Sequence, residues 1–277
     1  MSEPDAIVAG AFARLEALQA LGARYCGAPG HLAAQSLLRT WLAAADETRE
    51  HRFTELFFGK DVDCVNFWAR LRGNQPGRLL LLTHYDTRPW ADRDADDPRA
   101  PVPGANDGGS GTVLMAELVA TLAERRQRPT VDLLFCDAED WHEIDGKEVA
   151  LGAARFVTAM ADDQRPDACL EVDMVAGREL VLDVDVSCQE HDPSYELTLS
   201  LFQLGRALAL PAFSMAKRHP YKWISCDHLP FMDAGIPTAL FMDLDYPEWH
   251  TRADTIEACS PASLVQIAKV LLAWIYR

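Results

Sequence analysis

The feature that most constrains the fold is an alternation of short apolar runs with segments of helical periodicity. Residues 78–83 form a continuous apolar run, which is typical of a strand buried on both faces of a sheet. Further strands are predicted at 131–136, 168–173 and 237–242, with helical segments between them. This alternation predicts a single-domain α/β/α sandwich with a mixed, largely parallel central sheet.

The expected elements leave no gap that would mark a second domain. The predicted strands cover 51–57, 62–72, 78–83, 131–136, 168–173, 179–185 and 237–242. The predicted helices cover 3–23, 31–45, 110–125, 148–160, 194–208, 228–234 and 261–276. No linker, repeat or low-complexity tract divides the 277 residues. We therefore expect one domain over 1–277, with the N-terminal helices of 1–50 packing on it.

Charge and cysteine usage narrow the classes of partner and compartment. The formal net charge of −16 argues against binding to nucleic acid or to anionic membranes, because both require a basic surface. No stretch is long and apolar enough to predict a transmembrane helix, and the first residues do not resemble a signal peptide. The seven cysteines are odd in number, scattered and without a Cys-x-x-Cys pair. We expect a reduced, cytoplasmic protein.

Five metal-competent side chains follow predicted strands or lie in a glycine-rich turn. They are His84, Asp107, Asp140, Asp173 and His250. Two imidazoles and three carboxylates are a ligand set that suits zinc in an open, catalytic site. Ligands of α/β sheets bind beyond the carboxyl ends of the strands, so these side chains are expected to converge there.

Each of these motifs also has a simpler interpretation. His84 and Asp86 lie on the same side of an extended segment, where Asp86 would orient the imidazole of a metal ligand. The alternative is a buried histidine bonded to an aspartate. Asp107, in the segment GANDGGSG at 104–111, is alternatively a helix N-cap. The three glycines beside it favour a backbone that brings the carboxylate close to a metal.

The two acids at 139 and 140 point in different directions from a strand end, so one can bind metal while the other moves protons. Two solvated loop acids are the alternative. Burial beside Trp141 would raise the pKa of Glu139 toward neutrality. Asp173 ends an apolar strand, where it would hold a second metal or share a proton with Glu139, and Glu171 is a weaker candidate for that role.

Several other side chains complete the set of candidates. Trp141, Tyr246 and Trp249 are candidate substrate-binding aromatics, although aromatics near a buried site are often core residues. His142, His191 and His219 are expected to be ordinary surface histidines.

Five segments together resemble the M28 metallopeptidase family and, within it, the glutaminyl cyclases. These segments are HYDTRPWAD at 84–92, VPGANDGGSG at 102–111, FCDAEDW at 135–141, CDHLPF at 226–231 and YPEWHT at 246–251. The resemblance covers about residues 75–277. It implies that Asp107, Asp140 and His250 hold one zinc and that His84 with Asp173 forms a second site. It also implies that Glu139, Asp173 and Asp227 are catalytic.

Cys226 departs from the cyclase pattern, in which an acid precedes Asp-His, and this shifts weight toward a hydrolase. The expected function is cyclisation of an N-terminal glutaminyl group to pyroglutamyl with release of ammonia, using one zinc per chain. The alternatives are an M28-type aminopeptidase or amidohydrolase with two zinc ions, and a non-catalytic binding module. The expected substrate is a small peptide or an amino-acid derivative.

Overall fold

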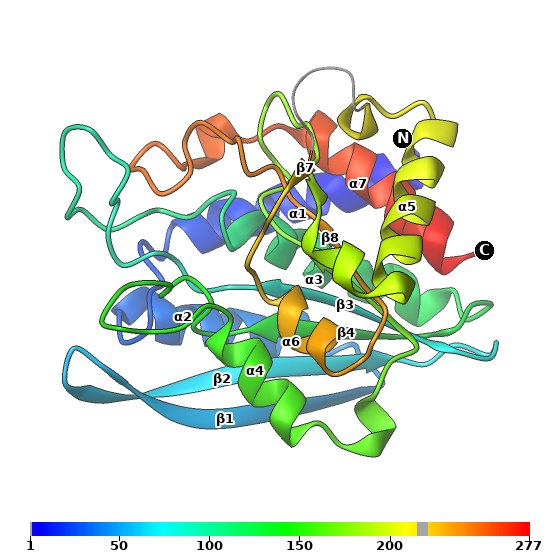
Figure 1. Ribbon diagram of the computed structural model, residues 1–277, viewed down its shortest axis with the longest axis horizontal. Coiled ribbons are helices and arrows are strands. Elements are labelled where there is room, and N and C mark those ends of the chain that lie inside the picture. The colour runs from blue at the N-terminus through cyan, green and yellow to red at the C-terminus, as the bar shows by residue number, and fades with distance from the viewer. Residues whose placement is uncertain (1, 215–220) are drawn as a thin grey trace.

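The computed structural model describes residues 2–214 and 221–277 and is built around a six-stranded sheet (Figure 1). Its strands are β1 (Glu47–Phe57), β2 (Lys60–Leu71), β3 (Arg78–His84), β4 (Thr130–Cys136), β5 (Ala168–Val172) and β8 (Thr238–Phe241), in the spatial order β1-β2-β4-β3-β5-β8. The pairs β1/β2 and β2/β4 are antiparallel, whereas β4/β3, β3/β5 and β5/β8 are parallel. The predicted mixed, largely parallel sheet is confirmed.

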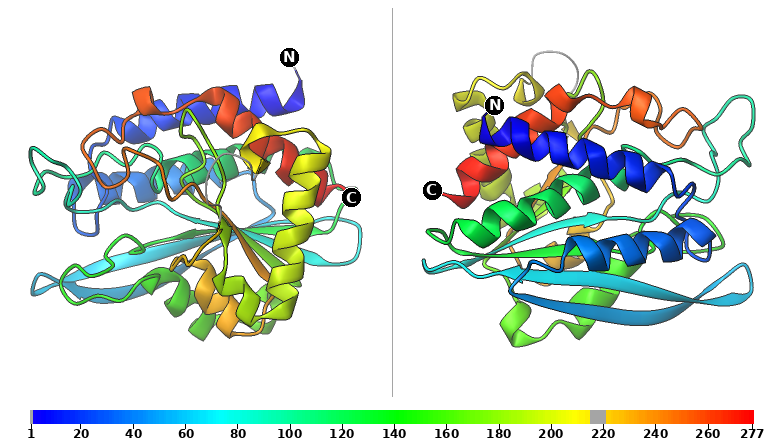
Figure 2. Two further views of the ribbon diagram at one scale, coloured as in Figure 1. Left: turned by 45° about the horizontal axis from the view of Figure 1, so that its top comes forward. Right: turned by 180° about the vertical axis from the view of Figure 1, so that it is seen from behind.

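Helices cover both faces of this sheet (Figure 2). The face with the chain termini carries α1 (Glu3–Gln19), α2 (Pro29–Trp41), α3 (Gly109–Glu124) and α7 (Pro261–Ile275), and the opposite face carries α4 (Leu151–Ala159) and α6 (His228–Asp233). Helix α5 (Asp192–Ala207) packs against β8 and α7. Short 3-10 helices occur at Asp162–Gln164, Ser187–Glu190, Pro211–Phe213 and Ile256–Ala258.

The inner strands are apolar on both sides because each side faces a separate core. In β2, Phe67 belongs to the large core under α1, α3 and α7, while Trp68 belongs to the smaller core under α4 and α6. In β4, Leu133 and Leu134 divide in the same way. Successive strand residues point to opposite faces, so a doubly covered strand reads as a continuous apolar run.

The predicted strand at 179–185 is wrong in its extent. Only Val184–Asp185 (β6) forms a strand, and it pairs with Tyr221–Lys222 (β7) in a separate two-stranded sheet. The preceding residues are buried, but their amides bond to loops: Leu182 N–H donates to the carbonyl of Ala212. An apolar run therefore indicates burial, but burial here occurs in a loop and not in a strand of the sheet.

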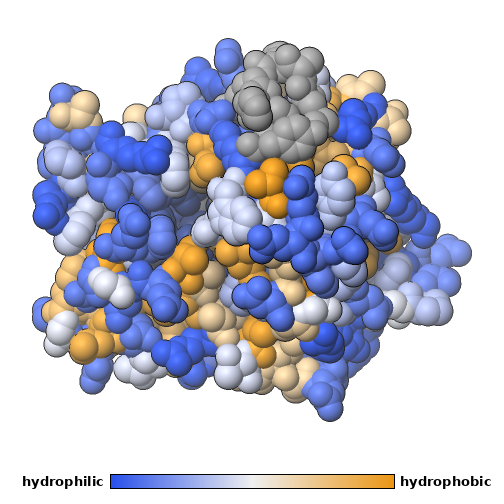
Figure 3. Space-filling model, viewed as in Figure 1, coloured by the Kyte–Doolittle hydropathy of each residue, from blue (hydrophilic) through white to orange (hydrophobic). Residues whose placement is uncertain are grey.

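The register of the parallel strands places the loops that follow them side by side. His84 lies opposite Cys136, and Leu82 lies opposite Glu171. The segments after β3, β4 and β5 consequently leave the sheet at one edge, as expected for ligand-binding loops. Hydrophilic side chains are spread over the face shown in Figure 3, among smaller apolar areas. No helix of the described residues is long and apolar enough to span a bilayer.

Candidate metal centre

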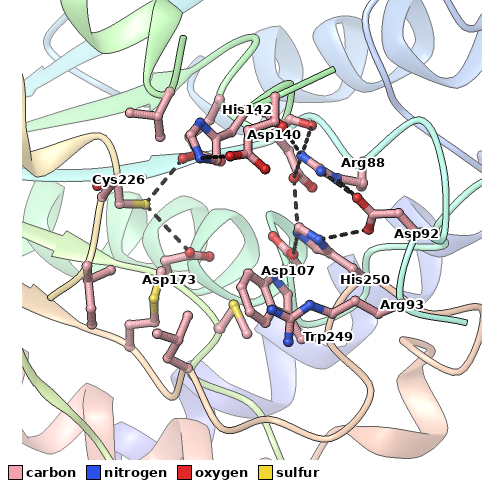
Figure 4. Close-up of a pocket in the computed structure, with 18 of the residues that line it drawn as sticks. Arg88, Asp92, Arg93, Asp107, Asp140, His142, Asp173, Cys226, Trp249 and His250 are labelled. Atoms are coloured by element: carbon pink, nitrogen blue, oxygen red, sulfur yellow. Dashed lines mark hydrogen bonds and ion pairs between the residues drawn. The ribbon is translucent and has the colours of Figure 1, made fainter. Parts of the chain in front are cut away.

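The structure brings the five predicted metal-binding side chains together in two buried triads that share Asp107. One triad is His84, Asp107 and Asp173, and the other is Asp107, Asp140 and His250; the ligand atoms of each triad lie within 4.8 Å of one another. The side chains labelled in Figure 4 show Asp107, Asp140 and His250 around one end of the pocket, with Asp173 beyond them.

The contacts within the triads are close. His84 Nε2 lies 3.2 Å from Asp107 Oδ1 and 3.3 Å from Asp173 Oδ1. His250 Nε2 lies 3.2 Å from Asp140 Oδ1 and 3.6 Å from Asp107 Oδ2. Asp107 thus faces both histidines, which is the position of a carboxylate able to serve either triad.

The donor atoms fit the zinc that the sequence predicts. Both ring nitrogens of His84, Oδ2 of Asp140 and Oδ1 of Asp173 are buried and have no hydrogen-bond partner among the described residues. A buried polar atom without a partner costs about 1–3 kcal/mol, so such atoms are rare unless they bind something else. Imidazole nitrogens and carboxylate oxygens are common zinc ligands. The unsatisfied atoms and their chemistry therefore point to a metal at this centre.

Asp86 positions the loop that follows β4. Its carboxylate accepts the backbone N–H groups of Glu139 and Asp140, both at 3.2 Å. The distance from Asp86 Oδ1 to His84 Nδ1 is 3.4 Å, and the geometry there is not that of a hydrogen bond. Asp86 therefore lies beside the His84 ring, where its orienting role stays a prediction, and it also anchors the peptide that carries the two site acids.

The backbone conformation of Ala138 makes the acidic side chains before and after it point in different directions. Its φ of 59° lies in the left-handed region, which is unusual for a residue with a Cβ. Asp137 before it points toward His31 in a different buried cluster, with Nε2 of His31 2.8 Å from Asp137 Oδ1. Glu139 and Asp140 after it line the pocket. One backbone residue thus assigns neighbouring carboxylates to different environments.

Asp92 is a site residue that the sequence reasoning missed. Its Oδ1 lies 3.2 Å from Nδ1 of His250, and its Oδ2 accepts from Nη2 of Arg88 at 2.5 Å. Partial burial raises the pKa of Asp92, but the hydrogen bonds from His250 and Arg88 outweigh it and lower the pKa. The carboxylate therefore stays charged and fixes the ring that presents Nε2 to the triad. His250 itself has a φ of 56°, an example of backbone strain at a functional site.

Asp254, also missed, holds the glycine-rich loop. It is buried and accepts the backbone N–H groups of Asn106 at 2.9 Å and Asp107 at 3.1 Å. The hydroxyl of Tyr246 donates to it at 3.0 Å. Tyr246 lies outside the lining of the metal pocket and lines a separate cavity, so its predicted contact with substrate is wrong. The sequence signal that could have identified Asp254 is its position, because it is a carboxylate only four residues after the predicted ligand His250.

Trp141 is also a support residue. It is fully buried, and its ring centroid lies 4.1 Å from that of Phe57 in a small core outside the pocket lining. Its predicted substrate contact is therefore wrong. Trp249 does line the pocket, and its ring lies 4.4 Å from that of His250.

The three histidines that were expected at the surface differ in exposure. His142 is half exposed at the pocket, and His191 is partly buried and bonded to Ser194. His219 lies outside the described residues.

Glu139 lies in the pocket wall beside the second triad. Burial raises the pKa of Glu139 well above its usual range, and the charges of Asp227, Asp140 and Asp173 raise it further, although His84 acts in the opposite direction. A carboxyl group in this state can hold a proton and release it to a bound molecule. The predicted upward shift is present and burial is its largest cause, as expected; the neighbouring carboxylates add to it.

Asp173 and Asp227 occupy different places. Asp173 lines the pocket, and its pKa is raised by burial and by neighbouring carboxylates. Asp227 is buried outside the pocket lining, with no hydrogen-bond partner for either oxygen among the described residues. The predicted catalytic role of Asp227 is corrected because it has no access to substrate. Burial and the charge of Glu171 raise the pKa of Asp227 well above its usual range.

Cys226 connects Glu139 to a second line of buried groups. Its Sγ lies 2.9 Å from Oε1 of Glu171 and 3.4 Å from Oε1 of Glu139. Glu171 also accepts the backbone N–H of His228 at 2.7 Å, and Nε2 of His228 lies 3.0 Å from Asp185 Oδ2. The thiol therefore stands where the cyclase pattern has an acid, with the carboxylate of Glu171 directly behind it.

Comparison with known proteins identifies the family. Residues 66–275 match the model of Peptidase family M28, and the chain therefore belongs to this family, as its motifs predicted. It is 25% identical to aminopeptidase YwaD of Bacillus subtilis over 73% of this chain and 41% of that protein. It is 23% identical to glutaminyl-peptide cyclotransferase of Bos taurus over 90% of this chain and 76% of that protein.

Solved structures of both activities share the fold. The glutaminyl cyclase of Tannerella forsythia is 22% identical and superposes with a TM-score of 0.88 over 98% of each chain. A leucine aminopeptidase precursor from Bacteroides thetaiotaomicron is 23% identical and also gives 0.88, over 98% of this chain and 97% of that chain. The scaffold is thus common to cyclases and peptidases, and the choice between them depends on the site.

Proposed function

We propose that this protein is a zinc-dependent glutaminyl cyclase that converts an N-terminal glutaminyl group to pyroglutamyl and releases ammonia. The observation that carries the proposal is the buried carboxyl group of Glu139, placed in the pocket wall beside the triad of Asp107, Asp140 and His250. The match to glutaminyl-peptide cyclotransferase of Bos taurus covers 76% of that protein, whereas the match to aminopeptidase YwaD covers 41%, and this difference supports the choice of reaction.

Asp107, Asp140 and His250 would hold one zinc. Three protein ligands leave a coordination position free for substrate, as in catalytic zinc sites. When bound, zinc supplies Lewis-acid polarisation of a carbonyl oxygen. The charged Asp92 keeps the His250 ring oriented, and Asp254 holds the backbone of Asp107, so the ligands need little rearrangement.

Glu139 would carry the proton between the two nitrogens of the reaction. The α-amine nitrogen of the substrate bonds to the side-chain amide carbon, and the bond from that carbon to the amide nitrogen breaks. Glu139 takes the proton that the α-amine loses and delivers it to the departing nitrogen, which leaves as ammonia. A raised pKa suits both halves of this transfer, because the carboxyl group must accept and donate near neutrality.

The pocket limits the size of the group that reaches Glu139. It has a volume of about 360 Å³, and Trp249, Ile224, Met242 and Leu244 give it apolar walls. A single glutaminyl side chain with its α-amine fits this space. The apolar walls also reduce access of water, which would otherwise compete with the α-amine for the amide carbon.

The second candidate function is an aminopeptidase. It is favoured by the complete second triad of His84, Asp107 and Asp173 and by the thiol of Cys226 in place of an acid. In that reaction Glu139 would take a proton from water, and two zinc ions would be present.

Metal counting and paired substrates separate the two candidates. We expect one zinc per chain, ammonia release from glutaminyl peptides and little cleavage of leucine anilides. Asp173→Asn should keep the zinc and impair cyclisation, and Asp61→Asn, at an exposed position remote from the pocket, is the matched control. Two zinc ions per chain, loss of one of them in Asp173→Asn and efficient anilide cleavage would establish the aminopeptidase instead.

A further inference from the structure

Arg93 extends the pocket wall beyond the zinc ligands. Its guanidinium carbon lies 3.8 Å from the centre of the Trp249 ring, and its backbone N–H donates to the carbonyl of His250 at 3.2 Å. Figure 4 shows the guanidinium beside the indole at the edge of the pocket. Stacking on an aromatic face and a fixed backbone both reduce the freedom of this long side chain.

Arg93 is a cation without an acidic partner. Neighbouring arginines are committed: Arg88 binds Asp92 and carbonyl groups, and Arg252 binds Asp94. Within residues 2–214 and 221–277, no carboxylate forms an ion pair with Arg93. Carboxylates outnumber cations in the pocket it lines, and the other guanidinium there, that of Arg88, is paired with Asp92. A free guanidinium in an acidic pocket is available to an anion that a substrate brings.

The distance to the metal centre suits a short substrate. The ring of Trp249 contacts both groups, at 3.8 Å from the guanidinium carbon of Arg93 and 4.4 Å from the imidazole centre of His250. The guanidinium carbon is therefore at most about 8 Å from the His250 ring. An extended residue spans about 3.3–3.6 Å, so a second residue reaches the guanidinium when the first is at the zinc.

We propose that Arg93 binds a carboxylate of the substrate and that the substrates are short glutaminyl compounds with an anionic group about two residues from the α-amine. The proposal rests on the cyclase function above and adds the substrate class. A guanidinium presents parallel N–H donors that match the two oxygens of a carboxylate. This carboxylate is either the C-terminus of a dipeptide or an acidic side chain at the second position.

Matched acids and amides test the assignment. We would measure kcat/KM of the zinc-loaded enzyme for Gln-Gly, Gln-glycinamide and Gln-Glu-amide at low ionic strength. We expect Gln-Gly to exceed its amide on the order of 5-fold, an effect typical of an exposed ion pair that added salt weakens. Gln-Glu-amide reports whether an acidic side chain substitutes for the terminal carboxylate.

Three variants assign the preference to Arg93. Arg93→Ala should reduce the acid-to-amide ratio to about one, and Arg93→Lys should retain part of it because the charge remains. Arg99 is the matched control. Its guanidinium carbon also lies over a tryptophan, 4.1 Å from the ring centre of Trp90, but Arg99 is outside the pocket lining. Arg99→Ala should keep the wild-type ratio.

Calorimetric binding of pyroglutamyl-glycine and its amide provides a readout without turnover. An acid preference that disappears in Arg93→Ala supports the assignment of Arg93 as the carboxylate-binding residue; if glutaminyl compounds are then not cyclised, the proposed function and the glutaminyl part of the substrate class are wrong. Equal binding and equal kcat/KM for acid and amide, or a preference that survives in Arg93→Ala, would overturn the inference while ammonia release continued to support the cyclase.

Discussion

Two buried clusters on either side of Ala138 contain the same kinds of side chain and differ in how their polar atoms are satisfied. Cys26, His31 and Asp137 lie close enough to hold a metal, as do the triads of the candidate centre. In the first cluster Asp137 accepts from Nε2 of His31 at 2.8 Å, the hydroxyl of Tyr85 at 2.6 Å and the amide of Val65 at 2.7 Å. None of its buried nitrogen and oxygen atoms lacks a partner among the described residues.

The candidate centre has the opposite character. His84, Asp140 and Asp173 each leave buried polar atoms without hydrogen bonds. A metal in the Asp137 cluster would have to replace good hydrogen bonds, whereas a metal between the triads satisfies atoms that otherwise cost free energy. Ligand types and short distances are therefore insufficient to identify a metal site, and the hydrogen-bond state of the same atoms distinguishes a structural cluster from a functional one.

The largest expected difference between the clusters is in zinc content. His250→Ala removes one of three ligands and should sharply lower zinc occupancy and abolish activity. His31→Ala should keep the zinc content of the wild type in the fraction that folds. Elemental analysis of both purified variants makes the comparison. Loss of zinc from His31→Ala with zinc retained in His250→Ala would reverse the assignment of the two clusters.

The next effect concerns Glu139, the acid proposed to move protons. Glu139→Gln keeps the shape of the side chain and should lower kcat by about 10²–10⁴-fold while zinc remains bound. Ammonia release and zinc content are measured on the same sample. The control is Asp61→Asn, which neutralises an exposed acid remote from the pocket. Zinc loss from Glu139→Gln would show instead that Glu139 is a ligand and that the roles of the two adjacent acids are exchanged.

A smaller effect is expected on stability from the satisfied cluster. Tyr85→Phe removes the hydroxyl that donates to Asp137 and should lower the free energy of unfolding by about 1.5–3 kcal/mol, the range for hydrogen bonds to charged groups. Urea denaturation of zinc-loaded protein measures it. A change below about 0.5 kcal/mol, the range of ordinary surface substitutions, would contradict the structural role of this cluster.

The smallest effect is a pH dependence of stability through His31. Burial lowers the pKa of His31, but the charge and hydrogen bond of Asp137 outweigh it and raise the pKa above 6.5. The stabilisation is therefore complete below about pH 6.5 and is lost as pH rises through the folded-state pKa. Unfolding free energies of the wild type and His31→Gln should converge as pH increases. A difference that grew with pH would show that His31 is neutral in the folded protein.

The sheet and the ligand set could be predicted because both depend on strand ends. Apolar runs located the strands, and parallel strands bring the residues after them to one edge, which placed His84, Asp140 and Asp173 together. The glycine-rich turn identified Asp107 because a close backbone approach requires glycine. Gly108 after it has a φ of 69°, and a Cβ there would lie 2.3 Å from the carbonyl oxygen of Asp86.

The supporting residues could not be predicted because they come from loops whose paths depend on tertiary contacts. Asp92 and Asp254 reach the site from segments without periodicity. Trp141 and Tyr246 were wrongly placed in the substrate pocket because proximity in sequence does not determine the direction of a side chain. Packing against Phe57 turns one away, and a hydrogen bond to Asp254 turns the other.

The left-handed conformation of Ala138 has a consequence for metal loading. Such a conformation costs about 1–2 kcal/mol for a residue with a Cβ, and the hydrogen bonds of Asp137 and Asp86 on its two sides maintain it. These bonds require no metal. The peptide that carries Asp140 is therefore held in place by the protein's own hydrogen bonds, and little chain entropy is lost when a metal binds.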